Sequence, residues 1–260
     1  MAPTEELLAR YQSLDSRDSS FVVEGRWNVE ALIGSKFETE SVLLAGDCQL
    51  EVDLPPEIPC LRLPKESVSQ LVGYKFHRGA LAIARRPQPL RYLDWLERRS
   101  LPEGALVLVA VGLANASNLG TIIRSAAAFG CSAVLVPERL GADPFSRKSV
   151  RASSGALFRI PVLECPDLAE DLQEIASTST VLATSLSEGS VPLHSLSSRK
   201  TLTHLVMGPE KDGLGKEWLR SASEVVHLPM ASGVDSLNVA TAAAVFLYAL
   251  TSSQSDRDRQ

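Results

Sequence analysis

The sequence predicts an α/β protein, with a parallel sheet in its larger C-terminal part and a smaller α/β domain before it. The apolar run from Ala105 to Val111 is typical of a strand buried on both faces of a parallel sheet. From there strand, helix and strand signals follow within about 35 residues, the spacing of a parallel βαβ unit. The chain has 260 residues, which is enough for two domains with a sizeable core.

Helix and strand signals also alternate through the first third of the chain. The residues between Pro55 and Pro64 contain four prolines, which indicates a loop-rich stretch. The other elements expected here are a short helix at 4–14, a strand at 21–23 followed by a glycine turn and a helix, a buried strand at 41–45, an element at 67–72 and a strand at 80–84.

The next helix begins near Asn118 and ends at Gly130, because apolar side chains recur at i, i+3, i+4, i+7 and i+8 and a glycine commonly follows the last turn. Arg124 lies off the apolar face and is free to point into a site. The remaining expected elements are strands at 133–136, 180–184, 205–207 and 225–230, a helix at 168–175, an apolar helix at 237–250 and a disordered tail at 252–260.

Composition narrows the class of protein. Apolar residues make up 45% and charged residues 22%, the proportions of a soluble globular protein. No apolar run reaches the roughly 18 residues that a membrane span needs, and the first residues do not resemble an export signal. A cytoplasmic location is therefore expected.

Charge and cysteine content bear on the partners. The net charge of -5 argues by itself against nucleic-acid binding, but basic residues cluster at 85–86, 91, 98–99 and 147–151 and can form a positive patch. Cys48, Cys60, Cys131 and Cys165 lie far apart without a Cys-x-x-Cys pair. We therefore predict buried thiols and no metal site.

Two strands end in glycine-bearing loops, one after Met207 and one after Met230. Ligands of open α/β sheets bind where the strands finish, and glycines let a backbone approach a ligand closely. The polar residues Glu210, Ser236 and Asn238 stand at these strand ends. The pattern indicates a ligand site.

Three clusters then carry a family resemblance. They are Asn118-x-Gly120-x-x-x-Arg124 with Phe129-Gly130 beyond it, Gly208-x-Glu210-x-x-Gly213-Leu214, and Leu228-Pro229-Met230-x-x-Gly233-x-x-Ser236-Leu237-Asn238-Val239. In this order, spread over nearly half of the chain, they resemble the three motifs of the SpoU, or TrmH, family of RNA ribose 2'-O-methyltransferases.

The resemblance implies a fold, a reaction and partners. The C-terminal domain would be a methyltransferase domain with a deep trefoil knot, acting as a homodimer whose sites include residues of both chains. It would transfer a methyl group from S-adenosylmethionine to a ribose 2'-hydroxyl of structured RNA, ribosomal RNA ahead of transfer RNA. The positions that correspond to the cofactor site are Thr184, Gly208, Leu228 and Leu237.

The resemblance also assigns catalytic roles. Arg124 corresponds to the catalytic arginine, proposed in the family as a base. A guanidinium is effectively always protonated, so clamping a phosphate and stabilising the developing alkoxide is the alternative. Asn118 would orient Arg124 or the ribose, unless it only caps its helix. Glu210 would fix the site across the dimer contact or pair with the arginine. Ser236 and Asn238 would hydrogen-bond the ribose, a phosphate or Glu210, although Ser236 or Asp235 could instead cap the last helix.

The N-terminal part shows a second similarity. Residues 24–26 together with residues 77–79 resemble the L30e-like substrate-binding domain that many SpoU-family enzymes carry. Arg26 would contact RNA phosphates, or else be a solvated surface residue, and Arg151 belongs to a stretch that lies against the site in relatives. The resulting organisation is an extension at 1–20, an L30e-like domain at 21–86, a partly helical linker at 87–103, a methyltransferase domain at 104–251 and the tail at 252–260.

Two other functions compete with this one. A Rossmann dehydrogenase would need Gly-x-Gly-x-x-Gly after an early strand, and Gly213-Leu214-Gly215-Lys216 is too late and incomplete. A non-catalytic RNA-binding protein with the same fold would have no need for all five polar residues of the motifs. Binding of S-adenosylmethionine separates this second alternative from an enzyme.

Overall fold

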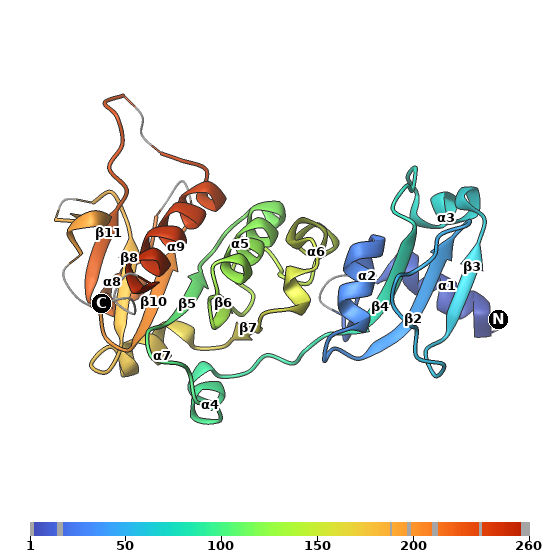
Figure 1. Ribbon diagram of the computed structural model, residues 1–260, viewed down its shortest axis with the longest axis horizontal. Coiled ribbons are helices and arrows are strands. Elements are labelled where there is room, and N and C mark those ends of the chain that lie inside the picture. Colours follow the sequence, from blue (N-terminus) through green and yellow to red (C-terminus); the bar gives the residue numbers. More distant parts are fainter. Residues whose placement is uncertain are drawn as a thin grey trace.

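The computed structural model describes residues 3–14, 18–187, 189–196, 199–209, 213–233 and 236–255, and it folds into two α/β units joined by one segment (Figure 1). The N-terminal unit contains a four-stranded sheet, and the C-terminal unit contains a seven-stranded sheet. No helix of these described residues is both long enough and apolar enough to cross a membrane.

The N-terminal sheet has the strand order β1-β4-β2-β3, antiparallel except for the β2/β3 pair. Strand β3 lies in the stretch that we expected to be a loop, because its four residues follow the prolines directly. The elements of this unit are α1 (Pro3–Ser13), β1 (Ser20–Glu24), α2 (Arg26–Ile33), β2 (Thr39–Ala45), β3 (Cys60–Leu63), α3 (Lys65–Val72) and β4 (Ala80–Arg85).

Helix α1 is part of the N-terminal core. Tyr11 is fully buried beside Val68 and Ile83, and its hydroxyl lies 2.8 Å from Ser41 Oγ. The first 20 residues, which we expected to be an extension, therefore contribute a helix that packs against α3 and β4.

The C-terminal sheet has the order β7-β6-β5-β10-β8-β11-β9, and every strand pair in it is parallel, as the apolar run at 105–111 predicted. Its strands are β5 (Ala105–Ala110), β6 (Ala133–Pro137), β7 (Val162–Cys165), β8 (Thr180–Thr184), β9 (Val191–Pro192), β10 (Leu202–Met207) and β11 (Glu224–His227). Its helices are α4 (Tyr92–Glu97), α5 (Ala116–Ala128), α6 (Arg147–Ser153), α7 (Leu168–Ile175), α8 (Lys216–Arg220) and α9 (Val239–Ser255), with short 3-10 helices η1 (Ala156–Phe158) and η2 (Leu193–Ser195).

Both faces of this sheet are covered, which explains the unbroken apolar sequence of β5. Leu106 and Leu108 join the core under α5 and α9, whereas Val107 and Val109 join the core under α4 and α7. Helix α9 ends at Ser255, so residues 252–255 are helical. The prediction that they belong to a disordered tail is wrong.

The two units meet in a cluster of four phenylalanine rings. Phe21 and Phe37 of the N-terminal unit pack on Phe145 and Phe158 of the C-terminal unit, with ring centroids 5.1 to 6.5 Å apart. These rings belong to one apolar core that continues from the first sheet into the second. The contact resembles the inside of a domain more than a flexible junction.

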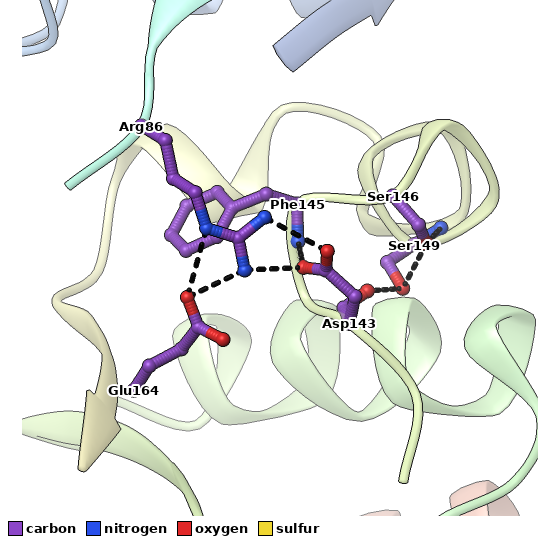
Figure 2. A network of polar contacts seen from close by, with 6 residues as sticks. All are labelled: Arg86, Asp143, Phe145, Ser146, Ser149 and Glu164. Atoms are coloured by element: carbon purple, nitrogen blue, oxygen red, sulfur yellow. Dashed lines mark hydrogen bonds and ion pairs between the residues drawn. The ribbon is translucent and has the colours of Figure 1, made fainter. Parts of the chain in front are cut away.

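Arg86 fixes the same junction by charge. Figure 2 shows its guanidinium between Asp143 and Glu164, with contacts of 2.8 Å and 2.6 Å, and with the ring of Phe145 5.0 Å from its carbon. The arginine and both carboxylates are about 10% exposed or less. Burial raises the pKa of Glu164 even though Arg86 donates to it. Arg86 therefore stabilises the junction between the units. The basic cluster at 85–86 had suggested a place for it in an RNA-binding patch, and the structure does not put it there.

The connecting segment is also packed. Arg91 pairs with the buried Asp171 at 2.8 Å, and Tyr92 of α4 lies 2.8 Å from Nε2 of His204, which is fully buried in β10. Burial lowers the pKa of His204 to about 4. The segment at 87–103 is thus partly helical, as predicted, and its cation at Arg91 is neutralised.

The four free cysteines differ in burial. Cys131 and Cys165 are buried, and burial raises the pKa of each thiol to about 12. Cys60 is exposed on β3 and Cys48 is half-buried. The prediction of buried thiols is therefore wrong for Cys60, because β3 is the edge strand of its sheet.

Candidate active site at the carboxyl edge of the parallel sheet

The predicted site residues come from loops at one edge of the parallel sheet. Strands β5, β8, β10 and β11 are parallel neighbours, so their carboxyl ends lie on the same side. Figure 1 shows residues 228–233, directly after β11, projecting from this edge. The edge is where ligands of open α/β sheets bind.

A cavity of about 390 Å³ opens at this edge. All four positions predicted for the cofactor line it, namely Thr184, Gly208, Leu228 and Leu237, and so does Ser236. Met207, Met230 and Phe246 add apolar surface. The cavity thus joins residues from β8, β10, β11 and α9 that lie far apart in the sequence.

Two of the lining residues are fixed by contacts with their neighbours. A Cβ at Gly208 would lie 2.9 Å from two side-chain atoms of Leu214, so this position has no room for a larger residue unless Leu214 moves. Thr184 Oγ1 donates to the carbonyl of Val206 at 3.2 Å, which ties the end of β8 to β10.

Asn118 and Asn238 bring the first and third motifs together. Asn238 Nδ2 donates to Asn118 Oδ1 at 3.2 Å, although the two residues are 120 positions apart. Neither Asn118 nor Ser236 caps a helix. Asn115 caps α5 by accepting from Ser117 and Asn118, and Asn238 caps α9 by accepting from Ala240 and Thr241. The capping alternatives considered for Asn118 and Ser236 are thus wrong.

Arg124 projects from α5 into solvent. It is exposed, and it forms no hydrogen bond or ion pair with any residue in the described part of the chain. Arg124 is not one of the described residues that line the cavity. Glu210, its predicted partner, lies outside the described residues. The guanidinium is therefore available to a ligand that approaches from solvent.

Gly120 of the first motif has a packing role. A Cβ at this position would lie 2.2 Å from the carbonyl oxygen of Ser149 and 2.7 Å from Cβ of Ala152, so glycine lets α5 and α6 pack closely. Ser149 Oγ lies 3.1 Å from the carbonyl of Ala116 and 2.7 Å from that of Asp143, and Figure 2 shows its place beside Ser146. The start of α5 is thereby anchored to α6.

Several lining residues were missed by sequence reasoning, and His227 is one of them. His227 lies in the wall of the cavity, and its Nδ1 is 2.9 Å from Ser190 Oγ. Its position directly before Leu228-Pro229 is a signal that could have drawn attention to it, because the following residue was already assigned to the site.

The predicted RNA-contacting arginines lie away from the cavity. Arg26 begins α2 and pairs with Glu51 at 3.0 Å and with Glu30 at 3.7 Å. Arg151 lies in the last turn of α6, half-buried. Neither lines the cavity in the described part of the chain.

A parallel sheet covered on both faces, with a ligand-sized cavity at its carboxyl edge, is the arrangement of an α/β protein with a small-molecule site. Residues 105–248 match the SpoU rRNA Methylase family. The chain belongs to this family.

Individual relatives agree with this assignment. The chain is 32% identical over 212 residues to an uncharacterized tRNA/rRNA methyltransferase of Mycobacterium avium, covering 80% of this chain and 64% of the relative's length. It is 32% identical over 206 residues to the 23S rRNA (guanosine-2'-O-)-methyltransferase RlmB of Acinetobacter baylyi, covering 76% and 80%. The structure of an AdoMet-bound rRNA methyltransferase from Sinorhizobium meliloti superposes with a TM-score of 0.79 at 25% identity, covering 97% and 95%.

Proposed function

We propose that this protein transfers a methyl group from S-adenosylmethionine to a ribose 2'-hydroxyl of a structured RNA, ribosomal RNA ahead of transfer RNA. The observation that carries the proposal is the contact between Asn118 and Asn238, which brings the first and third motifs together next to the cavity. The printed name of the Acinetobacter relative supports the same reaction and the same class of RNA.

The cavity fits the cofactor. Its volume of about 390 Å³ lies within the range of small-molecule sites, and its walls combine apolar side chains such as Met207 and Phe246 with the glycine at 208. Thr184, Gly208, Leu228 and Leu237 would hold the molecule. When bound, S-adenosylmethionine supplies an activated methyl group. The protein then has to place the ribose oxygen in line and assist the loss of its proton, and positioning alone lowers such barriers substantially.

Arg124 would act on the RNA. Its side chain is exposed and not neutralised within the described residues, so it can bind a phosphate and stabilise the negative charge that develops on the 2'-oxygen. Action as a base is the alternative role. Asn118 and Asn238, joined to each other, would fix the ribose, and Ser236 and Glu210 would complete this polar group. All five residues remain assigned as the catalytic set.

The N-terminal unit would bind the RNA as an L30e-like domain at 21–86, and its sheet with helices on both sides supports this assignment. Arg26 and Arg151 would contact phosphates from the two units. The insertion of β10 between β5 and β8 supports the trefoil knot, in which the segments after β10 and β11 would be threaded.

A homodimer would complete the site. Helix α9 is apolar, and Val245 and Tyr248 on it are 43% and 62% exposed, which suits a contact with a second copy of the chain. The chains would pair through this helix, so that each site lies near residues of both.

Two experiments test the proposed function. Titration of S-adenosylmethionine by calorimetry comes first, since a non-catalytic RNA-binding protein with this fold would give no heat. Reverse-transcription mapping of ribose methyl groups should then show one position that is methylated in cells with the protein and unmodified in cells without it. Arg124→Ala should abolish the same methyl group and leave S-adenosylmethionine affinity within about twofold, because the side chain does not line the cavity. An unchanged map would refute activity on cellular RNA.

A further inference from the structure

Trp27 is the most exposed large apolar side chain that the structure describes, at 66%. The other two tryptophans of the chain, Trp95 and Trp218, are each only 4% exposed. An indole ring exposed to this degree leaves its face open to stacking by a planar ligand. The neighbouring residues indicate which kind.

Arg26 lies beside the ring and is also paired with Glu51 at 3.0 Å and Glu30 at 3.7 Å. The guanidinium carbon of Arg26 lies 4.8 Å from the centroid of Trp27, within the range of a cation–π contact. Arg78 pairs with the buried Glu24 at 3.1 Å, and its carbonyl accepts from the backbone N–H of Arg26 at 3.0 Å. The loop before β4 and the start of α2 are thus tied together, and they present two held arginines beside one exposed aromatic ring.

A cavity of about 420 Å³ lies at this point. Its walls include Trp27, Arg26, His77, Arg78 and Gln49, a set that offers a flat apolar surface together with donors and acceptors. Gly79 has a φ of +77°, and a Cβ there would lie 2.7 Å from Cys48 Sγ, so the backbone approaches the cavity where a side chain would not fit. The hollow is large enough for one planar heterocycle.

We propose that Trp27 is a stacking platform for an unpaired base of the RNA substrate, with Arg26 and Arg78 beside the phosphates of the same nucleotide. Bases stack on aromatic side chains only where they are free of a duplex, so the ligand is a loop, a bulge or a strand end. The proposal rests on RNA being the substrate, and it names the part of the RNA that the N-terminal unit holds.

The platform and the cavity at the carboxyl edge belong to different units. Figure 1 shows the loop before β4 and the residues directly after β11 both toward the top of the view, at opposite ends of the longest axis. Strand β1 is antiparallel to β4, with Glu24 opposite Leu81, so α2 starts beside this loop.

Tryptophan fluorescence tests the proposal directly. Because Trp95 and Trp218 are buried, a base that stacks on Trp27 should quench the exposed, red-shifted part of the emission. The probe is an RNA hairpin with a uridine-rich loop, compared with a blunt-ended duplex of the same length. We expect quenching by the hairpin and none by the duplex. Equal quenching by both, or none by either, would overturn the platform.

Two variants separate stacking from general binding. Trp27→Ala should weaken hairpin binding about tenfold, whereas Trp27→Phe should stay within about threefold of the wild type while the quenching disappears. Both should bind S-adenosylmethionine as the wild type does, since Trp27 does not line the other cavity. Unchanged hairpin affinity in Trp27→Ala refutes the platform.

The outcome is independent of the reaction itself. A protein that quenches with the hairpin and never methylates RNA would retain the platform and lose the proposed enzymatic function. A protein that methylates RNA with the same KM after Trp27→Ala would keep the function and lose the platform.

Discussion

Asn238 Nδ2 donates to Asn118 Oδ1 across 3.2 Å, and this single bond connects the beginning of α5 to the beginning of α9. Asn238 has a second task, because its Oδ1 accepts from the backbone N–H groups of Ala240 and Thr241. The two tasks use different atoms of one amide. They can therefore be separated by substitution.

Asn238→Asp should keep the cap and lose the donor. The carboxylate still accepts from the first turn of α9, but it places an acceptor against Asn118 Oδ1, so we expect kcat/KM to fall at least about tenfold. The thermal midpoint should change by less than about 3 °C. Steady-state methylation assays and calorimetric melting measure the two effects. Asn238→Ala is the matched control, and it should lose about 1 kcal/mol of stability as well. Wild-type kcat/KM in both variants would contradict a catalytic role for the contact.

Gly120→Ala should destabilise the fold. The added Cβ would lie 2.2 Å from the carbonyl oxygen of Ser149, a backbone atom that cannot move without shifting α6, so we expect a loss of about 2 kcal/mol or more. Gly130→Ala is the comparison, because nothing lies within 4 Å of its Cβ and only its φ of +72° is unfavourable, which costs about 1 kcal/mol. Urea unfolding of both variants gives the difference. Equal losses would mean that α5 and α6 can separate at little cost.

Arg86→Ala should weaken the junction between the two units. The substitution leaves Asp143 and Glu164 buried without their cation, which typically costs about 3 kcal/mol or more. The neighbouring Arg85 is 62% exposed and pairs with the exposed Glu38, so Arg85→Ala should cost less than about 1 kcal/mol. Urea unfolding gives both values. Small-angle scattering should also show a larger maximum dimension for Arg86→Ala alone, and identical curves would argue that the phenylalanine cluster suffices.

His204 should make stability depend on pH. Its pKa in the folded protein is lowered by burial to about 4, while in the unfolded chain it keeps the ordinary histidine value of about 6.5. As pH falls, His204 therefore binds a proton in the unfolded state before it does so in the folded state. Proton binding favours the unfolded state, and the folded protein loses stability. Between pH 7 and pH 5 this loss amounts to about 2 kcal/mol.

His204→Gln removes that titration and keeps a polar side chain near Tyr92. The variant should be less stable than the wild type at pH 7 but should lose about 2 kcal/mol less between pH 7 and pH 5. Denaturant unfolding at the two pH values gives the comparison. Parallel pH profiles would show that the imidazole is not buried in solution.

Local patterns explain how far the sequence predicted the fold. The helix at 168–175 and the strand at 180–184 were predicted to the residue, because each has its apolar period within one short segment. The strands β3 and β7 were missed, since both have four residues and follow prolines that indicate a loop. Helix α5 begins two residues before Asn118 because Asn115 provides the cap.

The site required more than local patterns. Family motifs indicated Thr184, Gly208, Leu228 and Leu237, and the structure gathers them around one cavity. The bond between Asn118 and Asn238 and the burial of Arg86 depend on segments that are distant in sequence. One sequence by itself does not show which distant residues contact each other. Trp27 was likewise indistinguishable from a core residue until its exposure was known.

The phenylalanine cluster and Arg86 hold the two units in one fixed relative position. If the N-terminal unit binds a free base at Trp27 and the C-terminal unit receives the ribose at the cavity, the distance between the two sites cannot adjust to the RNA. The target nucleotide would then be chosen by its distance from an unpaired base in the folded RNA, and sequence around the methylated position would matter little.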